Sequence, residues 1–118
     1  MKKAVKNKIT EVAESLGFAI SFTEKENVDI LFSKFSSCGQ DFNIEITVDI
    51  NADLMDIWRE LQSYWENFDV SAEAYLWLDE SGHGKNGAPY EMIDVYKDMQ
   101  ECEGFIEQLA DKVYEIAK

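Results

Sequence analysis

The chain has 118 residues, of which 24 are acidic and 11 basic, and its formal net charge is −13. One domain over residues 1–118 is expected at this length. A composition that is 46% hydrophobic, with 3 Trp, 5 Tyr and 7 Phe, argues against intrinsic disorder. The charge argues against direct nucleic-acid binding, which needs basic patches, and against binding to anionic membranes.

The charge is unevenly distributed along the chain. Residues 1–10 carry four lysines and no acid, so that the other 108 residues have a net charge of −17. Residues 41–111 hold 18 acids against three basic residues. Because solubility needs a net charge of only about 2–8 on a small domain, we interpret the excess as a sign that the negative field has a role.

The cysteines and the absence of apolar segments bear on location. Cys38 and Cys102 lie far apart in sequence and form no Cys-x-x-Cys pair. The basic N-terminus lacks the apolar run of a secretory signal, and no stretch is long and apolar enough for a transmembrane helix. We therefore expect a cytoplasmic protein with two reduced thiols, and a disulfide or a reactive thiol is the alternative.

Hydrophobic periodicity predicts the first half of the fold. A helix is expected over 3–16, followed by strands over 18–24 and 28–36. Residues 41–50 give the cleanest strand pattern, because five apolar and five polar residues alternate strictly. The short connections predict an antiparallel β-meander with one buried face and one solvated face.

The second half is expected to be helical. Asn51 or Asp53 would cap a helix that runs to about residue 68. Ser71 is a plausible cap for a short element over 72–79, for which we favour helix over strand. A glycine-rich loop over 80–89 then leads to a helix from residue 90 to the C-terminus. The fold class is therefore α+β, with the order α-β-β-β-α-α-α and helices packed on one face of a three-stranded sheet.

The last helix carries an apolar seam with spacings that alternate between three and four residues. Such a seam packs against a sheet or another helix, or it joins two copies of the chain. Gly104 lies within this helix, where a glycine costs about 1 kcal/mol relative to alanine and can allow a kink. The seam consists of Met92, Val95, Met99, Cys102, Ile106, Leu109, Val113 and Ile116.

The loop Gly82–Gly87 matches G-x-G-x-x-G, but the chain after it has no room for the second strand of a dinucleotide-binding unit. We interpret it as a tight turn, or as a partner-contacting loop with His83 and Lys85 at its tip. A calcium loop beginning at Asp79 would place Tyr90 where a bidentate glutamate is required. We expect no metal, no cofactor and, with a single histidine and no catalytic constellation, no enzyme.

Rows of acids are the candidate partner-binding residues. Like charges at i,i+4 destabilise a helix by a few tenths of a kcal/mol each, so the last helix tolerates repulsion to hold negative charge. Its acids are about 5.4 Å apart on average along the helix axis, whereas the phosphates of one DNA strand are about 3.4 Å apart. A second row of acids must therefore contribute if the surface is to match the charge density of a nucleic-acid backbone. The helix rows are Glu91, Asp94, Asp98 and Glu101, and Glu107, Asp111 and Glu115; the second row is Asp41, Glu45 and Asp49 or Asp53, Asp56 and Glu60.

The chain resembles small phage and mobile-element inhibitors, the anti-CRISPR and anti-restriction proteins that mimic DNA. The features that carry this resemblance are the order of elements, the acidic strand 41–50 and the acid rows 91–101 and 107–115. This resemblance implies a non-enzymatic protein that occupies the basic nucleic-acid-binding surface of a nuclease or other partner. The alternatives are a structural or adaptor module, such as a homodimer through the last helix, and a small ligand-binding or enzymatic domain that uses the loop 82–87.

Overall fold

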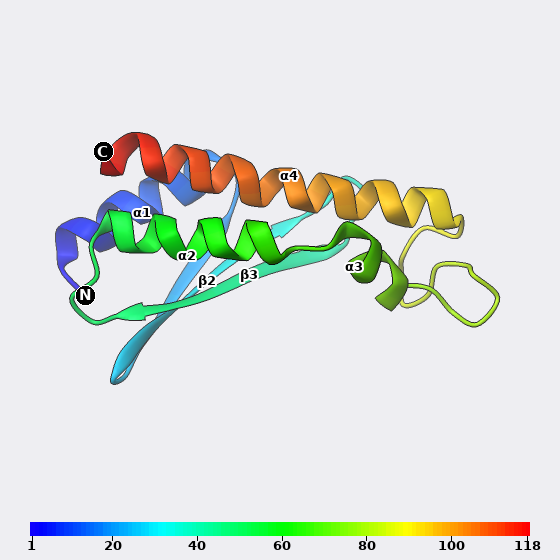
Figure 1. Ribbon diagram of the computed structural model, residues 1–118, viewed down its shortest axis with the longest axis horizontal. Helices are drawn as coiled ribbons and strands as arrows, with labels where there is room; N and C mark the ends of the chain where they lie inside the picture. Colours follow the sequence, from blue (N-terminus) through cyan, green and yellow to red (C-terminus); the bar gives the residue numbers. More distant parts are fainter.

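The computed structural model describes all 118 residues and contains four helices and one three-stranded sheet (Figure 1). The predicted α+β class and the order α-β-β-β-α-α-α are confirmed. In chain order the elements are α1 (Lys3–Ser15), β1 (Ala19–Glu24), β2 (Asn27–Phe35), β3 (Asp41–Asp49), α2 (Leu54–Asn67), α3 (Val70–Leu76) and α4 (Met92–Ala117).

The sheet is the predicted antiparallel meander with β2 in its centre. Ile30 of β2 is paired with Phe22 of β1 and with Ile46 of β3, so that apolar side chains from all three strands lie on one face. Along β3 the side chains alternate strictly between the core and solvent, as the period of two predicts. The opposite face is therefore lined mainly by polar residues.

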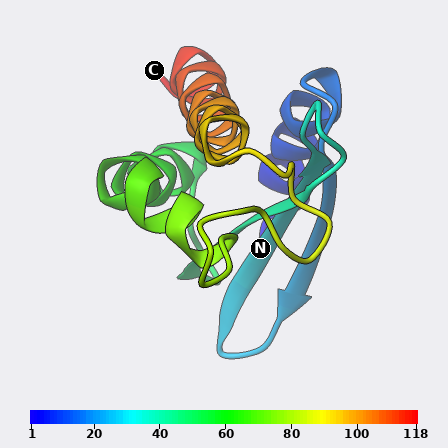
Figure 2. The same cartoon turned by 90° about the vertical axis from the view of Figure 1, so that its right-hand side faces the viewer.

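The three long helices cover only one face of the sheet (Figures 1 and 2). They bury a core of 18 residues to which α1, α2, α4, β2 and β3 contribute, and Ile20 and Phe22 of β1 pack against it as partly buried residues. The other face of the sheet has no helix on it. A smaller core of Ala74, Val95, Met99 and Cys102 joins α3 to α4. Phe42 packs against both clusters, so the two cores form a continuous apolar layer.

Carboxylate caps set where α2 and α3 begin. The Asp53 side chain accepts from the amide of Asp56 at 2.9 Å, and the Asp56 carboxylate accepts from the amide of Asp53 at 3.0 Å, which makes a reciprocal capping box. For α3 the prediction of a cap at Ser71 is wrong, because Asp69 accepts from the amides of Ser71 and Ala72 and the helix begins two residues earlier than predicted, at Val70.

The apolar seam of α4 is part of the internal core. Six of its eight residues are buried, and only Met92 and Ile116 at its ends are exposed. The seam is therefore not free to join two copies of the chain. The helix is one unbroken element through Gly104, and neither α4 nor any other helix combines the length and apolarity that a membrane crossing requires.

Candidate functional site: an acidic groove between β3 and α2

Two of the predicted acid rows lie on neighbouring elements. On β3, Asp41, Glu45 and Asp49 are all exposed because they occupy the alternate positions that face away from the core. Asp53, the cap of α2, and Glu60 within α2 are exposed, and the side of the helix that carries Glu60 lies next to β3. The structure therefore brings Glu45 of the outer strand and Glu60 of the second helix to one groove. The other two members of the helix row are elsewhere, because Asp53 lines a different hollow beside α1 and Asp56 is paired with Arg59.

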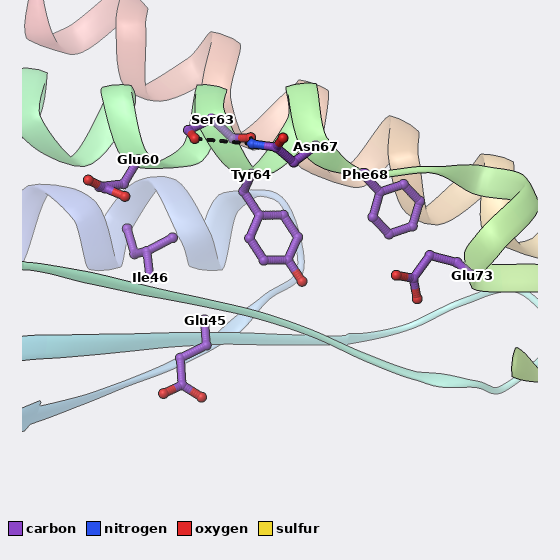
Figure 3. Close-up of a pocket in the computed structure, with 8 residues that line it drawn as sticks. All are labelled: Glu45, Ile46, Glu60, Ser63, Tyr64, Asn67, Phe68 and Glu73. Atoms are coloured by element: carbon purple, nitrogen blue, oxygen red, sulfur yellow. Dashed lines mark hydrogen bonds between the residues drawn. The ribbon is translucent and has the colours of Figure 1, made fainter.

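Between these elements lies a groove of about 410 Å³, which we call the β3–α2 groove. In Figure 3, Tyr64 and Phe68 extend from α2 toward the strand, and Glu73 enters from α3, while Glu45 points from β3 to the open face of the sheet. The lining residues are Glu45, Ile46, Glu60, Ser63, Tyr64, Asn67, Phe68 and Glu73.

Tyr64 links the two walls of the groove. Its hydroxyl donates to the main-chain carbonyl of Asn43 at 3.3 Å, so the ring spans from α2 to the outer edge of β3. Burial raises the pKa of this phenol above its ordinary value, and the neighbouring charge of Glu73 raises it further. The hydroxyl is therefore a neutral donor at physiological pH.

The groove continues along β3 toward the β2–β3 turn. A second hollow of about 180 Å³ shares Tyr64, Phe68 and Glu73 with the first and extends past Asp41 and Asn43. Phe42 and Phe68 form its apolar floor, with ring centroids 6.0 Å apart in an edge-to-face arrangement. The combined groove therefore follows the outer strand over several residues.

The negative charge of the groove is not neutralised within the chain. Only three ion pairs form in the whole protein, between the N-terminus and Glu24, Arg59 and Asp56, and Lys112 and Glu115. No lysine or arginine lines either hollow. At physiological salt, exposed charges repel one another over about 8 Å, so bringing a cation into this groove relieves repulsion.

The second half of the first acid row of α4, Asp98 and Glu101, is not a free surface. Asp98 is only 3% exposed and neither of its carboxylate oxygens has a hydrogen-bond partner. Glu101 accepts from the amide and the hydroxyl of Ser37 at 2.8 and 2.9 Å. The prediction that Asp98 belongs to a solvent-facing row is wrong, because the helix turns this position toward the β2–β3 turn.

Glu91 and Asp94 of that row are exposed, as are Glu107 and Asp111 of the second row. The β2–β3 turn also carries Cys38, whose pKa is raised by burial and then by the charge of Asp98. Both cysteines are unpaired, and burial raises the pKa of Cys102 to about 12. Neither thiol has the lowered pKa of a nucleophile.

The glycine-rich loop is shaped by its own backbone. Gly82 and Gly87 adopt positive φ angles of 83° and 86°, and a Cβ on Gly84 would lie 1.8 Å from the carbonyl oxygen of Pro89. Lys85 is exposed, as predicted. The expectation for His83 is wrong, because it is half-buried and stacks on Tyr90 with ring centroids 4.0 Å apart.

The loop does not offer a cation site. Oδ1 of Asp79 accepts from the amide and hydroxyl of Ser81 and from the amide of His83, and the hydroxyl bond lowers the pKa of the carboxyl group. No three His, Cys, Asp or Glu side chains anywhere in the chain lie in an arrangement that could hold a metal ion. Of the hollows beside the loop, one is lined by Gly82 and another by Lys85, and His83 lines neither.

Several groove residues were missed from the sequence. Glu73 reaches the groove because α3 follows α2 at the end of the groove and packs on α4, an arrangement that no local pattern encodes. Tyr64 and Phe68 are four residues apart and therefore share a face of α2, a spacing that could have marked them as one wall. The same is true of Ser63 and Asn67, whose side chains are hydrogen bonded to each other.

Large apolar side chains are exposed at the C-terminal end of α3 and around the start of α4. They are Tyr75, Leu76, Tyr90, Met92 and Ile93. Comparison with known proteins finds no matching family model, no matching curated protein and no matching solved structure.

Proposed function

We propose that the chain is a non-enzymatic binding protein whose acidic β3–α2 groove and the adjoining open sheet face occupy a cationic surface of a partner protein. The observation that carries this proposal is the concentration of exposed carboxylates on β3, α2 and α3 without any basic residue in the groove to pair with them. The natural target is a surface of lysines and arginines that otherwise binds nucleic acid.

Charge rather than phosphate-like spacing supports this choice of partner. Asp41, Glu45 and Asp49 are each four residues apart on an extended strand, which is about 13.6 Å at a rise of 3.4 Å per residue. That spacing is wider than the spacing of phosphates along DNA. We therefore propose competition for the cationic surface and do not require that the acids reproduce the geometry of a nucleic-acid backbone.

The mechanism follows from electrostatics. Long-range attraction between a strongly acidic and a strongly basic surface accelerates association, and this attraction is weakened by salt. Once the surfaces meet, Tyr64 and Phe68 supply apolar contact at the centre of the charged rim, where aromatic side chains stabilise interfaces most. Two unpaired thiols suit a reducing compartment, so we place this function in the cytoplasm.

Displacement of DNA from basic proteins tests the proposal. A panel of purified nucleases and DNA-binding domains is loaded with a short fluorescent duplex, and the release of the duplex is measured as the chain is added. We expect release from at least one of them, with an apparent affinity that falls steeply as salt is raised. The groove variant carries three substitutions, Glu45→Gln, Glu60→Gln and Glu73→Gln, and we expect it to bind at least about tenfold more weakly.

A second triple variant controls for total charge. It removes three exposed carboxylates of α4, so that its net charge equals that of the groove variant, and we expect its affinity to stay within about threefold of the wild type. Equal losses in both variants, or no release from any protein of the panel, would contradict the proposal. The control substitutions are Glu107→Gln, Asp111→Asn and Glu115→Gln.

A further inference from the structure

The hydrogen-bond pattern of the sheet determines which backbone groups of β3 are free. At the β2–β3 turn the amide of Ser36 donates to the carbonyl of Gln40 at 2.9 Å. Because hydrogen-bonded and non-hydrogen-bonded pairs alternate in an antiparallel ladder, the even-numbered residues of β3 are bonded to β2. The odd-numbered residues therefore direct their N–H and C=O groups away from the sheet.

This outer edge is almost unpaired. The Asn43 carbonyl accepts from the Tyr64 hydroxyl, and the Asp49 carbonyl accepts from the amide of Ala52 at 3.0 Å. The outward amides of Asn43, Glu45 and Thr47 have no hydrogen-bond partner in the chain. An unpaired edge of this kind is a template for another extended strand.

The surroundings of the edge define the chemistry of such a strand. The side chains of the outward-directed residues project onto the open sheet face, where Asp41, Glu45 and Asp49 are exposed and have no ion-pair partner. A side chain directly opposite them on a neighbouring strand lies about 5 Å away, within reach of an ion pair. The other face of an added strand would meet Tyr64 and Phe68 across the groove.

We propose that the free edge of β3 binds an extended segment of a partner protein as a fourth strand, with basic and apolar side chains alternating along it. The basic side chains pair with the acids of the open face, and the apolar ones cover Tyr64 and Phe68. This inference rests on the proposed function, because it specifies how the acidic groove holds a cationic partner.

The test uses a heptapeptide that alternates lysine and valine. Amide hydrogen exchange measured by NMR reports strand addition directly, because the outward amides become hydrogen bonded only if a strand pairs with them. We expect exchange at Asn43, Glu45 and Thr47 to slow at least about tenfold, the effect of forming one hydrogen bond at each. A peptide with glutamate in place of lysine should leave their exchange unchanged.

The edge of β1 provides an internal control. There the amide of Lys25 donates to the carbonyl of Asn27, so the odd-numbered residues of β1 bond to β2 and the outward amides are those of Ile20 and Phe22. No acidic groove accompanies this edge. We expect the exchange of Ile20 and Phe22 to be unaffected by the peptide.

Two N-methylated peptides separate strand addition from charge attraction. Methyl groups on every second amide block either the edge that faces β3 or the edge that faces away from it, at equal peptide charge. We expect one methylated peptide to bind at least about tenfold more weakly and the other to bind like the parent. If both methylated peptides bind like the parent and exchange does not slow, strand addition is overturned, while charge-based binding stands. If the parent peptide does not bind, strand addition is also overturned. In that case the DNA-displacement experiment decides the proposed function separately.

Discussion

Replacing Asp98 by asparagine should stabilise the protein. The carboxylate is 3% exposed and neither oxygen accepts a hydrogen bond from an N–H or O–H group. The weakly donating thiol of Cys38 is its polar neighbour, and Asp94 and Glu101 of the same helix add negative charge there. A buried polar group without a partner costs about 1–3 kcal/mol, and a charged one more. Asparagine keeps the shape of the side chain and removes the charge, so we expect a gain of about 1–3 kcal/mol in the free energy of unfolding at neutral pH.

Urea unfolding and calorimetry measure this gain. For 118 residues the unfolding entropy is about 250 cal/mol/K, so each kcal/mol raises Tm by about 4 °C, and the expected shift is about 4–12 °C. The control is Asp111→Asn on the exposed side of the same helix, for which a change within about 0.5 kcal/mol is expected. A loss of stability of more than about 1 kcal/mol in Asp98→Asn would contradict this expectation, since it would mean that the carboxylate is satisfied in the fold.

Three further predictions concern the thiols and the glycines. In the native protein a thiol reagent should modify Cys38 at once and Cys102 only after unfolding, since Cys102 is fully buried; equal rates would contradict its burial. Because the folded pKa of Cys102 is about 12, above the ordinary value of 9.0, the contribution of this thiol to stability is complete below pH 9 and is lost as the pH rises. At about pH 10.5 the free energy of unfolding of the wild type should have fallen by about 2 kcal/mol more than that of Cys102→Ala, as measured by urea unfolding at each pH. Gly84→Ala should destabilise the protein by about 1–3 kcal/mol through its clash with Pro89, whereas Gly104→Ala, with open space around the added methyl group, should stabilise it by about 1 kcal/mol, and thermal unfolding of both variants checks the opposite signs.

Local patterns predicted the elements well because their causes are local. The alternation along β3 follows from the period of a strand with one buried face, and Asp53 begins α2 because its carboxylate bonds the first free amides. The cap of α3 was misplaced for a related reason: Asp69 and Ser71 are both good caps, and which one is used depends on how the chain leaves α2.

The site was harder to predict because it depends on which sides of distant elements face one another. Spacing along α4 placed Asp98 in a row with Asp94 and Glu101, yet the β2–β3 turn packs against that side of the helix and buries Asp98. Glu73 has no spacing relation to Glu45 or to any residue of α2 that would bring it into the groove. The net charge could be predicted from composition. The face on which carboxylates remain unpaired could be identified only from the tertiary structure.

The most direct test of the acidic face is its mapping by NMR. The ¹⁵N-labelled chain is titrated with a basic DNA-binding protein from which it displaces DNA, and amide shifts are recorded at each step. Our expectation is that the largest shifts lie on β3 and along the groove side of α2, around Glu45 and Tyr64, and that they vanish when duplex DNA is added in excess. Shifts centred on Glu107 and Asp111 of α4, or spread evenly over all exposed acids, would contradict it.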